Sequence, residues 1–474
     1  MSGTFNKESK WLAFEKLGIK LDNHYVETAQ DIMNGYAGKL FSNPEKKIIN
    51  ENEFAKCFRD VNNLQYSNGL FYTNRGKETE DVIAQDIWKS LDGCGISQDV
   101  ATKTNKLLGA VKLASTVPNL KPKENIIPFK NGDFDYTTKT FYLGVYNPTP
   151  YRLSVDLVTN YKSSKSFKKW LNDLFMPEDI PVIQQYLGYC LVPNTKAQKA
   201  LFLVGEGGAG KSVMGVILES LLGNAMVSTA NTQEFMSDKF KLPELENKLV
   251  LYDDDLDSAA LSATGLYKKL ITNTQPITAD RKYGQPFQFT PQIKIVSCCN
   301  EMLSSNTDQT SGFFRRLHPI LIKPIADDFK PDLNFYDKIR NEKEDILLWA
   351  LEGLFTLMGN NWELPVSQRT LDYLNNKQSI ANPFPEFMNS VFEFRKDYNI
   401  TTNEINAIKD YWARQNGVEK YQMNNFDKWL TDNGEKYGVK RSRTIKRNGK
   451  YLRGVEGMQI KAEWQLNSSG IELS

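Results

Sequence analysis

A glycine-rich turn separates an apolar run from an apolar, helix-like segment near the middle of the 474-residue chain. The turn reads Gly205-Glu206-Gly207-Gly208-Ala209-Gly210-Lys211-Ser212. Its glycines can adopt positive φ and let the backbone curl, so that successive N–H groups point at an anion that a Cβ would obstruct. The next segment, 213–223, reads as a buried helix ended by glycine, and its positive N-terminus would face the same anion. A strand, this turn and a helix in this order predict a phosphate-binding loop.

The end of the turn supplies the side chains that nucleoside triphosphate chemistry requires. Lys211 can reach the β- and γ-phosphates, and the Ser212 hydroxyl can ligate Mg²⁺. We therefore expect ATP and Mg²⁺ as cofactors. The residues expected to surround the nucleotide are Gly205, Glu206, Gly207, Gly208, Ala209, Gly210, Lys211, Ser212 and Val213. The alternative is a chance match in a long chain, but the flanking strand and helix are the context that the motif requires.

A second buried strand, at 248–252, ends in the carboxylates of Asp253, Asp254 and Asp255. Ligands of open α/β sheets collect at the carboxyl ends of parallel strands, so this is where Mg²⁺ would lie. We expect Asp253 to hold the hydrated metal and Asp254 to orient or deprotonate the attacking water. The triplet leaves the register open, and Asp255 could take either role. The alternative is an ordinary solvated acidic turn.

A third buried strand, at 292–299, ends at Asn300, and two arginines follow fifteen residues later. Asn300 could hydrogen-bond the attacking water or the γ-phosphate. Arg315 and Arg316 end a hydrophobic segment, and in an oligomeric ATPase either arginine could reach the γ-phosphate bound by a neighbouring subunit. Such an arginine finger contributes about 10³ to 10⁵ in rate, which would make hydrolysis depend on assembly. The alternative is that both arginines are surface charges.

In this order and spacing the motifs resemble the superfamily 3 helicases, and within them the phage, plasmid and poxvirus primase-helicase ATPases. The resemblance starts at about residue 126 and includes Asn131-Gly132-Asp133 ahead of the loop and Phe314-Arg315-Arg316-Leu317 after it. It implies an α/β fold with an AAA+ type P-loop ATPase core, in which the loop of one subunit and an arginine of the next share one ATP. It also implies a homo-hexamer that translocates 3′ to 5′ on single-stranded DNA during replication of a phage or other mobile genetic element.

The N-terminal part of the chain departs from many members of that family. It is too short for the usual fused primase domain plus a linking domain, and it has no paired carboxylates with a histidine. The two histidines of the chain are His24 and His318. We therefore expect no primase activity on this polypeptide. A separate primase or replication initiator is the expected protein partner, beside single-stranded and forked DNA.

Residues 277–289, between the acidic strand and the Asn300 strand, read as a β-hairpin with Arg281, Lys282 and Tyr283 near its tip. A basic tip with one aromatic can hold a phosphate and lie against a base or sugar without reading sequence. In the family that the chain resembles, this hairpin lines the central pore of the hexamer, and Lys282 is the position expected to contact DNA. The alternative is an ordinary exposed turn.

A second basic surface lies near the C-terminus, where Asn448-Gly449 is a strong signal for a type I′ turn between two strands. Residues 436–453 contain eight basic side chains and no acidic one. Because helical patterns precede this hairpin, we expect a winged-helix domain whose wing contacts phosphates through Lys446, Arg447 and Lys450. A solvated surface hairpin is the alternative.

Composition limits the kinds of binding site and the cellular location that the chain can have. Lys and Arg number 59 against 57 Asp and Glu, so nucleic-acid contacts must come from local patches. Five cysteines without CxxC spacing argue against a zinc knuckle or a disulfide framework, and indicate reduced, mostly buried thiols. The longest apolar stretch, at 346–358, is too short to span a membrane and contains Glu352. With no signal region at the N-terminus, we expect a cytoplasmic protein without membrane contact.

The length predicts several domains. We expect a mostly helical N-terminal region of unknown role at 1–120 and a small α+β and helical collar at 121–195. An ATPase core with a lid would follow at 196–380, with the segment 345–354 as a lid helix. A winged-helix domain would occupy 381–474, after the linker Pro383-Phe384-Pro385.

Two other functions fit parts of the pattern. An ATP-dependent replication initiator or loader would bind DNA and remodel a partner without translocating, and it would show DNA-stimulated ATP hydrolysis without unwinding. A small-molecule kinase would use the same phosphate loop as a monomer, without a need for Arg315 or Arg316. The kinase interpretation leaves the basic C-terminal hairpin unexplained, and the order of the motifs favours the helicase.

Overall fold

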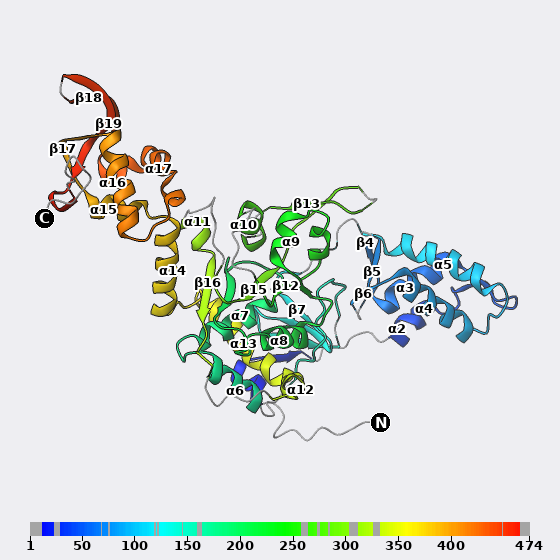
Figure 1. The fold of residues 1–474 in the computed structure, drawn as a ribbon. Helices are drawn as coiled ribbons and strands as arrows, with labels where there is room; N and C mark the ends of the chain where they lie inside the picture. The colour runs from blue at the N-terminus through cyan, green and yellow to red at the C-terminus, as the bar shows by residue number, and fades with distance from the viewer. Residues whose placement is uncertain are drawn as a thin grey trace. The chain divides into compact units, whose positions relative to one another are not determined.

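The computed structural model describes residues 12–22, 29–67, 69–73, 76–117, 120, 123–144, 146–158, 164–256, 264–272, 275–282, 285–302, 311–325, 332–447 and 449–464. The chain divides into two compact units. The first comprises residues 1–258, 262–303 and 315–367, and the second comprises residues 259–261, 304–314 and 368–474. Figure 1 shows the helices and strands of both units.

A five-stranded parallel sheet forms the centre of the first unit (Figure 1). In their order across the sheet its strands are β11 (Val227–Thr229), β12 (Val250–Asp253), β15 (Lys294–Cys299), β10 (Ala200–Val204) and β16 (Leu317–Leu321). Every residue of β10, β12 and β15 is buried, as expected for parallel strands that are covered on both faces. The prediction of a mixed α/β fold with a parallel sheet is confirmed.

The connections of this sheet diverge at two neighbouring strands. From β10 the chain runs through α8 (Val213–Leu222) to the far edge strand β11, whereas from β15 it runs in the opposite direction to β16. Connections that leave adjacent parallel strands in opposite directions open a crevice outside the carboxyl ends of those strands. The glycine-rich turn follows β10 directly and therefore lies at this crevice.

A glycine in one helix allows two of the helices around the sheet to approach closely. A Cβ at Gly353 in α13 (Lys343–Gly359) would lie 2.2 Å from the carbonyl oxygen of Gln184 in α7 (Ile180–Cys190), so only glycine fits there. The segment expected to be a lid helix lies within α13, which is largely buried and packs against α7 and α8. The other helices around the sheet are α6 (Lys165–Leu174), α9 (Thr232–Ser237), α10 (Thr264–Thr272) and α12 (Phe335–Asn341).

A second sheet joins residues that are far apart in the sequence. Its order is β1 (Lys20–Asp22), β9 (Thr140–Leu143), β8 (Gly132–Asp135) and β7 (Ile126–Phe129). β7, β8 and β9 form an antiparallel meander, and β1 adds to β9 in parallel. Phe14, in α1 (Leu12–Leu17), packs edge-on against Phe141. The segment between β1 and β7 is therefore an insertion between two strands of the same sheet.

The described residues between 29 and 117 have a small core of their own, which includes Phe58, Phe71, Ile87 and Val111. α3 (Glu51–Asn62) is capped by Asn50, whose side chain accepts a hydrogen bond from the Glu53 N–H. The elements of this region are α2 (Ala29–Gly35), β2 (Phe41–Asn43), β3 (Ile48–Ile49), α3 (Glu51–Asn62), β4 (Gln65–Ser67), β5 (Leu70–Thr73), β6 (Gly76–Glu78), α4 (Glu80–Gly93) and α5 (Val100–Ser115). Short strands therefore accompany the helices that the sequence predicts.

The second unit packs helices on a three-stranded antiparallel sheet. The strands lie in the order β17 (Phe392–Thr401), β19 (Lys450–Ile460) and β18 (Lys440–Arg447). In its core the Phe387 ring packs against Trp412 and Phe426, with ring centroids 5.3 and 5.0 Å away. Thr401 and Glu404 form a capping box at the start of α16 (Thr402–Gln415). The helices of this unit are α11 (Ser311–Phe314), α14 (Gln368–Ala381), α15 (Phe384–Val391), α16 (Thr402–Gln415) and α17 (Phe426–Asn433).

Two expectations from composition concern the whole chain. All five cysteines are free, and all but Cys94 are buried, which confirms the prediction of mostly buried, unpaired thiols. Among the residues that the structure describes, no helix has both the length and the apolar character needed to cross a bilayer.

Candidate functional site

The glycine-rich turn has the positive φ angles on which its predicted role in anion binding depends. Gly208 and Gly210 have φ of +82° and +93°, a region that other residues adopt rarely. Apart from the adjacent residues, no atom lies within 4 Å of where a Cβ of Gly207 or Gly210 would be, so the space at these two positions is open. The Gly205 N–H donates to the Cys299 carbonyl oxygen at 3.0 Å, which fixes the start of the loop to β15.

Lys211 is buried at the base of this loop. Its ammonium group donates hydrogen bonds to the carbonyl oxygens of Gly205 and Glu206, the second at 2.8 Å. These two bonds give the buried ammonium group hydrogen-bond acceptors within the loop itself. They are also bonds that the ammonium group can exchange for phosphate oxygens, because Lys presents three donors on a flexible stem.

Asp253 is the buried member of the acidic triplet. It ends β12 and is 4 % exposed, whereas Asp254 and Asp255 are exposed beyond the strand end. Burial raises the pKa of the Asp253 carboxyl group, although the Thr232 N–H donates to its Oδ2 at 2.6 Å. A buried carboxylate is costly unless it is paired or coordinates a cation. The geometry therefore separates one buried carboxylate from two solvent-accessible ones.

Asn300 lies beside the loop because of strand register. Val204 pairs with Cys299, so the residues that follow them, Gly205 and Asn300, leave the sheet at the same edge. Asn300 is exposed there. Asp253 pairs with Ser297 of the same strand β15, so all three predicted motifs meet at the carboxyl edge of the sheet.

Arg315 and Arg316 lie at the other ends of the strands, the amino ends. The Ala200 N–H, at the start of β10, donates to the Arg316 carbonyl oxygen at 2.8 Å, and Lys199 donates to the carbonyl oxygen of Arg315 at 2.6 Å. The length of β10 separates these arginines from the loop, which corresponds to about 16 Å for five extended residues. The structure does not bring the two arginines to the glycine-rich loop of the same chain.

The predicted hairpin is formed by β13 (Ile277–Ala279) and β14 (Phe287–Phe289), which pair in antiparallel fashion. Arg281 is already engaged, since its guanidinium donates to Glu246 at 2.8 Å and lies 4.2 Å from the ring centroid of Phe287. Lys282 is exposed, and Tyr283 lies outside the described residues. Of the two described basic residues near the tip, Lys282 is therefore the more accessible to a ligand.

The predicted basic hairpin of the second unit is formed by β18 and β19. Lys446 and Lys450 are exposed on it. Arg447 differs, because its guanidinium donates to the side-chain oxygen of Asn399 at 2.6 Å and to the Asn399 carbonyl oxygen at 2.9 Å. Arg447 thus braces the hairpin against β17.

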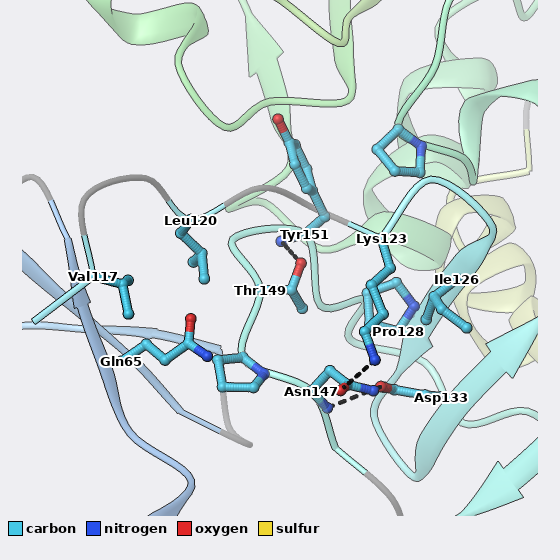
Figure 2. Close-up of a pocket in the computed structure, with 12 residues that line it drawn as sticks. Gln65, Val117, Leu120, Lys123, Ile126, Pro128, Asp133, Asn147, Thr149 and Tyr151 are labelled. Carbon is cyan, nitrogen blue, oxygen red and sulfur yellow. Dashed lines mark hydrogen bonds between the residues drawn. The ribbon is translucent and has the colours of Figure 1, made fainter. Parts of the chain in front are cut away.

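A pocket of about 310 Å³ lies away from the phosphate loop (Figure 2). Inside it, the backbone and side-chain N–H groups of Asn147 donate to Asp133 Oδ2, and Lys123 donates to Asn147 Oδ1 at 2.9 Å. Asp133 also forms a buried ion pair with Arg152 at 3.1 Å. The preceding Asn131 exchanges two hydrogen bonds with the backbone of Leu157. Through these contacts the Asn131-Gly132-Asp133 segment stabilises the structure around the pocket, away from the glycine-rich loop.

Sequence reasoning missed the residues that support the loop. The Trp170 indole N–H donates to the Gly210 carbonyl oxygen at 3.0 Å, and the ring of Tyr252 packs where a Cβ of Gly215 would lie, 2.4 Å from Tyr252 Cε1. Trp170 belongs to α6, forty residues before the loop, and an apolar helix face carried no signal of that contact. Gly215 inside an apolar helix was a visible signal, since such a glycine indicates close packing.

Comparison with known proteins places these motifs in one matched segment. Residues 203–316 match DUF5906, a family of unknown function, and this segment includes Lys211, Asp253, Asn300 and both arginines. Over 219 residues the chain is 28 % identical to the "Putative helicase L207/L206" of Acanthamoeba polyphaga mimivirus, a match that covers 43 % of this chain and 22 % of that protein. The chain therefore spans less than a quarter of the length of this curated relative.

The fold is similar to that of a solved structure. The apo structure of the C-terminal region of NrS-1 superposes with a TM-score of 0.51 at 15 % sequence identity, over 83 % of this chain and 95 % of that chain. At this identity the likeness concerns the fold alone. The superposed region covers more of the chain than the matched segment 203–316 does.

Proposed function

We propose that this chain is an ATP-dependent DNA helicase of the superfamily 3 type, with an AAA+ type P-loop ATPase core, acting in replication of a phage or other mobile genetic element. One observation carries the proposal. The phosphate loop, the buried Asp253 carboxylate and Asn300 converge at the carboxyl edge of one parallel sheet. The helicase name of the mimivirus relative supports the choice among ATPases.

The residues at this edge fit ATP and Mg²⁺. The space over Gly207 and Gly210 is open, and Asp253 is a buried carboxylate of the kind that Mg²⁺ binds in ones or twos beside phosphates. Among the described residues no cluster of three or more metal-ligating side chains exists, which suits an ion held mainly by phosphate and water.

Each residue then has a stated task. Lys211 would exchange the carbonyl oxygens of Gly205 and Glu206 for phosphate oxygens, while Ser212 and Asp253 would hold the metal. Bound Mg²⁺ would neutralise charge on the phosphates. Asp254, exposed beside Asp253, would orient or deprotonate the attacking water, and Asn300 would hydrogen-bond that water or the γ-phosphate.

The placement of the two arginines supports assembly of the chain into an oligomer with ATP sites between subunits. Because Arg315 and Arg316 lie at the edge opposite the loop, they could act only on a nucleotide bound by another subunit. A closed ring, which we propose to be a homo-hexamer moving 3′ to 5′, places such an edge against the loop of its neighbour. ATP hydrolysis would then move the β13–β14 hairpin, with Lys282 holding single-stranded DNA.

The experiment that tests this function is unwinding of a forked DNA duplex by Lys211→Ala. We expect loss of both ATP hydrolysis and unwinding. Lys338→Ala is a matched control, because this exposed lysine pairs with Asp332 at the surface, and it should unwind as the unchanged protein does. Unwinding by Lys211→Ala at the unchanged rate would refute the motor assignment.

A replication initiator or loader is the second candidate. It is favoured by the basic β18–β19 hairpin, which belongs to a compact unit other than the one that holds the phosphate loop. DNA-stimulated ATP hydrolysis without strand displacement would select this function. A separate primase would be the partner in either case.

A further inference from the structure

One face of the basic hairpin combines an exposed aromatic ring with two cations. Figure 1 shows β18 and β19 extending as a two-stranded ribbon beyond the helices of their unit. In this ribbon Lys446 lies directly opposite Tyr451, and Arg453 follows Tyr451 by two residues on the same strand. Cross-strand partners and alternate residues of a strand share one face of the sheet, so these three side chains lie together.

The ring of Tyr451 is open to solvent. It is 68 % exposed, and both Lys446 and Arg453 are exposed beside it. Burial of aromatic rings is a main source of folding free energy, so a ring that contributes so little to a core is available for a ligand.

The other face of the ribbon has a structural role instead. There Arg447 lies opposite Lys450, and its contacts with Asn399 hold the ribbon to β17. Ile445, also on that face, is 3 % exposed. The ribbon is therefore anchored through one face and leaves the Tyr451 face open.

We propose that the Tyr451 face binds single-stranded DNA, with a base stacked on the Tyr451 ring and the neighbouring phosphates paired with Lys446 and Arg453. This inference rests on the proposed nucleic-acid function and adds a stacking residue to it. An aromatic platform between cations suits any base, because each base has a π-face and each nucleotide has a phosphate. An acidic protein surface would need the cations and would gain nothing specific from the ring.

The test measures binding of the full-length chain to a fluorescent oligo-dT without ATP, across a series of salt concentrations. Tyr451→Ala should weaken binding about 5- to 150-fold, the range expected for one lost base stack, with the salt slope unchanged. Tyr451→Phe and Tyr451→Trp should bind within twofold of the unchanged protein. Lys446→Ala should reduce the salt slope by about 0.7, the value for one phosphate contact on a single strand.

Three outcomes would overturn the proposal. Tyr451→Ala could bind as tightly as the unchanged protein, or Tyr451→Phe could bind as weakly as Tyr451→Ala, which would assign the effect to the hydroxyl group. Tyr336→Ala could also weaken binding equally, although this exposed tyrosine lies on α12 of the other unit. Because no variant alters the phosphate loop, ATP hydrolysis measured in parallel separates failure of this inference from failure of the motor assignment.

Discussion

The indole N–H of Trp170 donates a hydrogen bond to the carbonyl oxygen of Gly210, at a distance of 3.0 Å. This bond ties helix α6 to the peptide that joins Gly210 to Lys211. Since that peptide also presents the Lys211 N–H, the orientation of a donor of the predicted phosphate-binding loop depends on a side chain forty residues earlier.

We expect Trp170→Phe to raise the KM for ATP about 2- to 12-fold, because one hydrogen bond contributes about 0.5 to 1.5 kcal/mol. The value of kcat should change less. Steady-state ATPase kinetics measure both. Trp349→Phe is the control, since the Trp349 ring packs 4.9 Å from Phe167 of the same helix but makes no bond to the loop. Equal effects of the two variants on KM would contradict a role for the Gly210 bond.

Gly215 sets how closely α8 approaches β12. Gly215→Ala would place a methyl group 2.4 Å from Tyr252 Cε1, next to Asp253 in the sequence. Because overpacking of a core typically costs about 1 to 3 kcal/mol, we expect a lower free energy of unfolding in urea and slower ATP hydrolysis. Gly265→Ala in α10, where nothing lies within 4 Å of the added Cβ, should leave both properties unchanged or slightly raise stability. Similar losses in the two variants would exclude a specific effect at Tyr252.

His318 makes stability depend on pH below neutrality. Burial lowers the pKa of this imidazole to about 3. The unfolded chain takes up the proton near pH 6.5, so between pH 6.5 and 3 the unfolded state binds more protons and stability falls as the pH is lowered. We expect the difference in unfolding free energy between the unchanged protein and His318→Leu to shift by about 1.4 kcal/mol per pH unit in this window. Parallel curves from pH 7 to 5 would show that folding does not lower the pKa of His318.

Mixing two inactive variants tests whether a site is shared. Lys211→Ala keeps both arginines, and the double variant Arg315→Ala/Arg316→Ala keeps the loop. Each should lose ATPase activity, the second by about 10³- to 10⁵-fold if one arginine acts as a finger. Their mixture should regain activity, because some neighbouring pairs combine an intact loop with intact arginines. Activity that stays absent in mixed assemblies of confirmed composition would contradict a shared site.

The hairpin tip gives a further test. Lys282→Ala should reduce the stimulation of ATP hydrolysis by single-stranded DNA, and it should reduce the salt slope of binding by about 0.7. Glu246→Gln should tighten DNA binding, because it releases Arg281 from its ion pair. If Glu246→Gln weakens binding, the Arg281 pair supports the hairpin and does not compete with DNA.

The sequence predicted the elements that local patterns encode. The strand–loop–helix around Lys211, the strand ending at Asp253 and both hairpins are visible because glycine turns and apolar periodicity report on neighbouring residues. The pairing of the strands was not predictable in this way. It places Asn300 beside Gly205 at the carboxyl ends of the strands and Arg315 at their amino ends.

Contacts between segments that are distant in the sequence could not be predicted from local patterns either. Neither the Trp170 bond to Gly210 nor the pairing of Arg281 with Glu246 leaves a local signal, because each depends on how separate helices and loops pack. The acidic triplet is an intermediate case. Its existence was evident, but only the burial of Asp253 distinguishes that carboxylate from Asp254 and Asp255.

The parallel pairing of β1 with β9 has a practical consequence for dissecting this protein. A fragment that begins after residue 120 would lack an edge strand of the very sheet it is meant to preserve, and would leave Phe141 without its neighbour Phe14. An N-terminal truncation would therefore remove part of the unit that holds the glycine-rich turn. Cutting out the 29–117 cassette and closing the gap with a short linker would keep that strand in place.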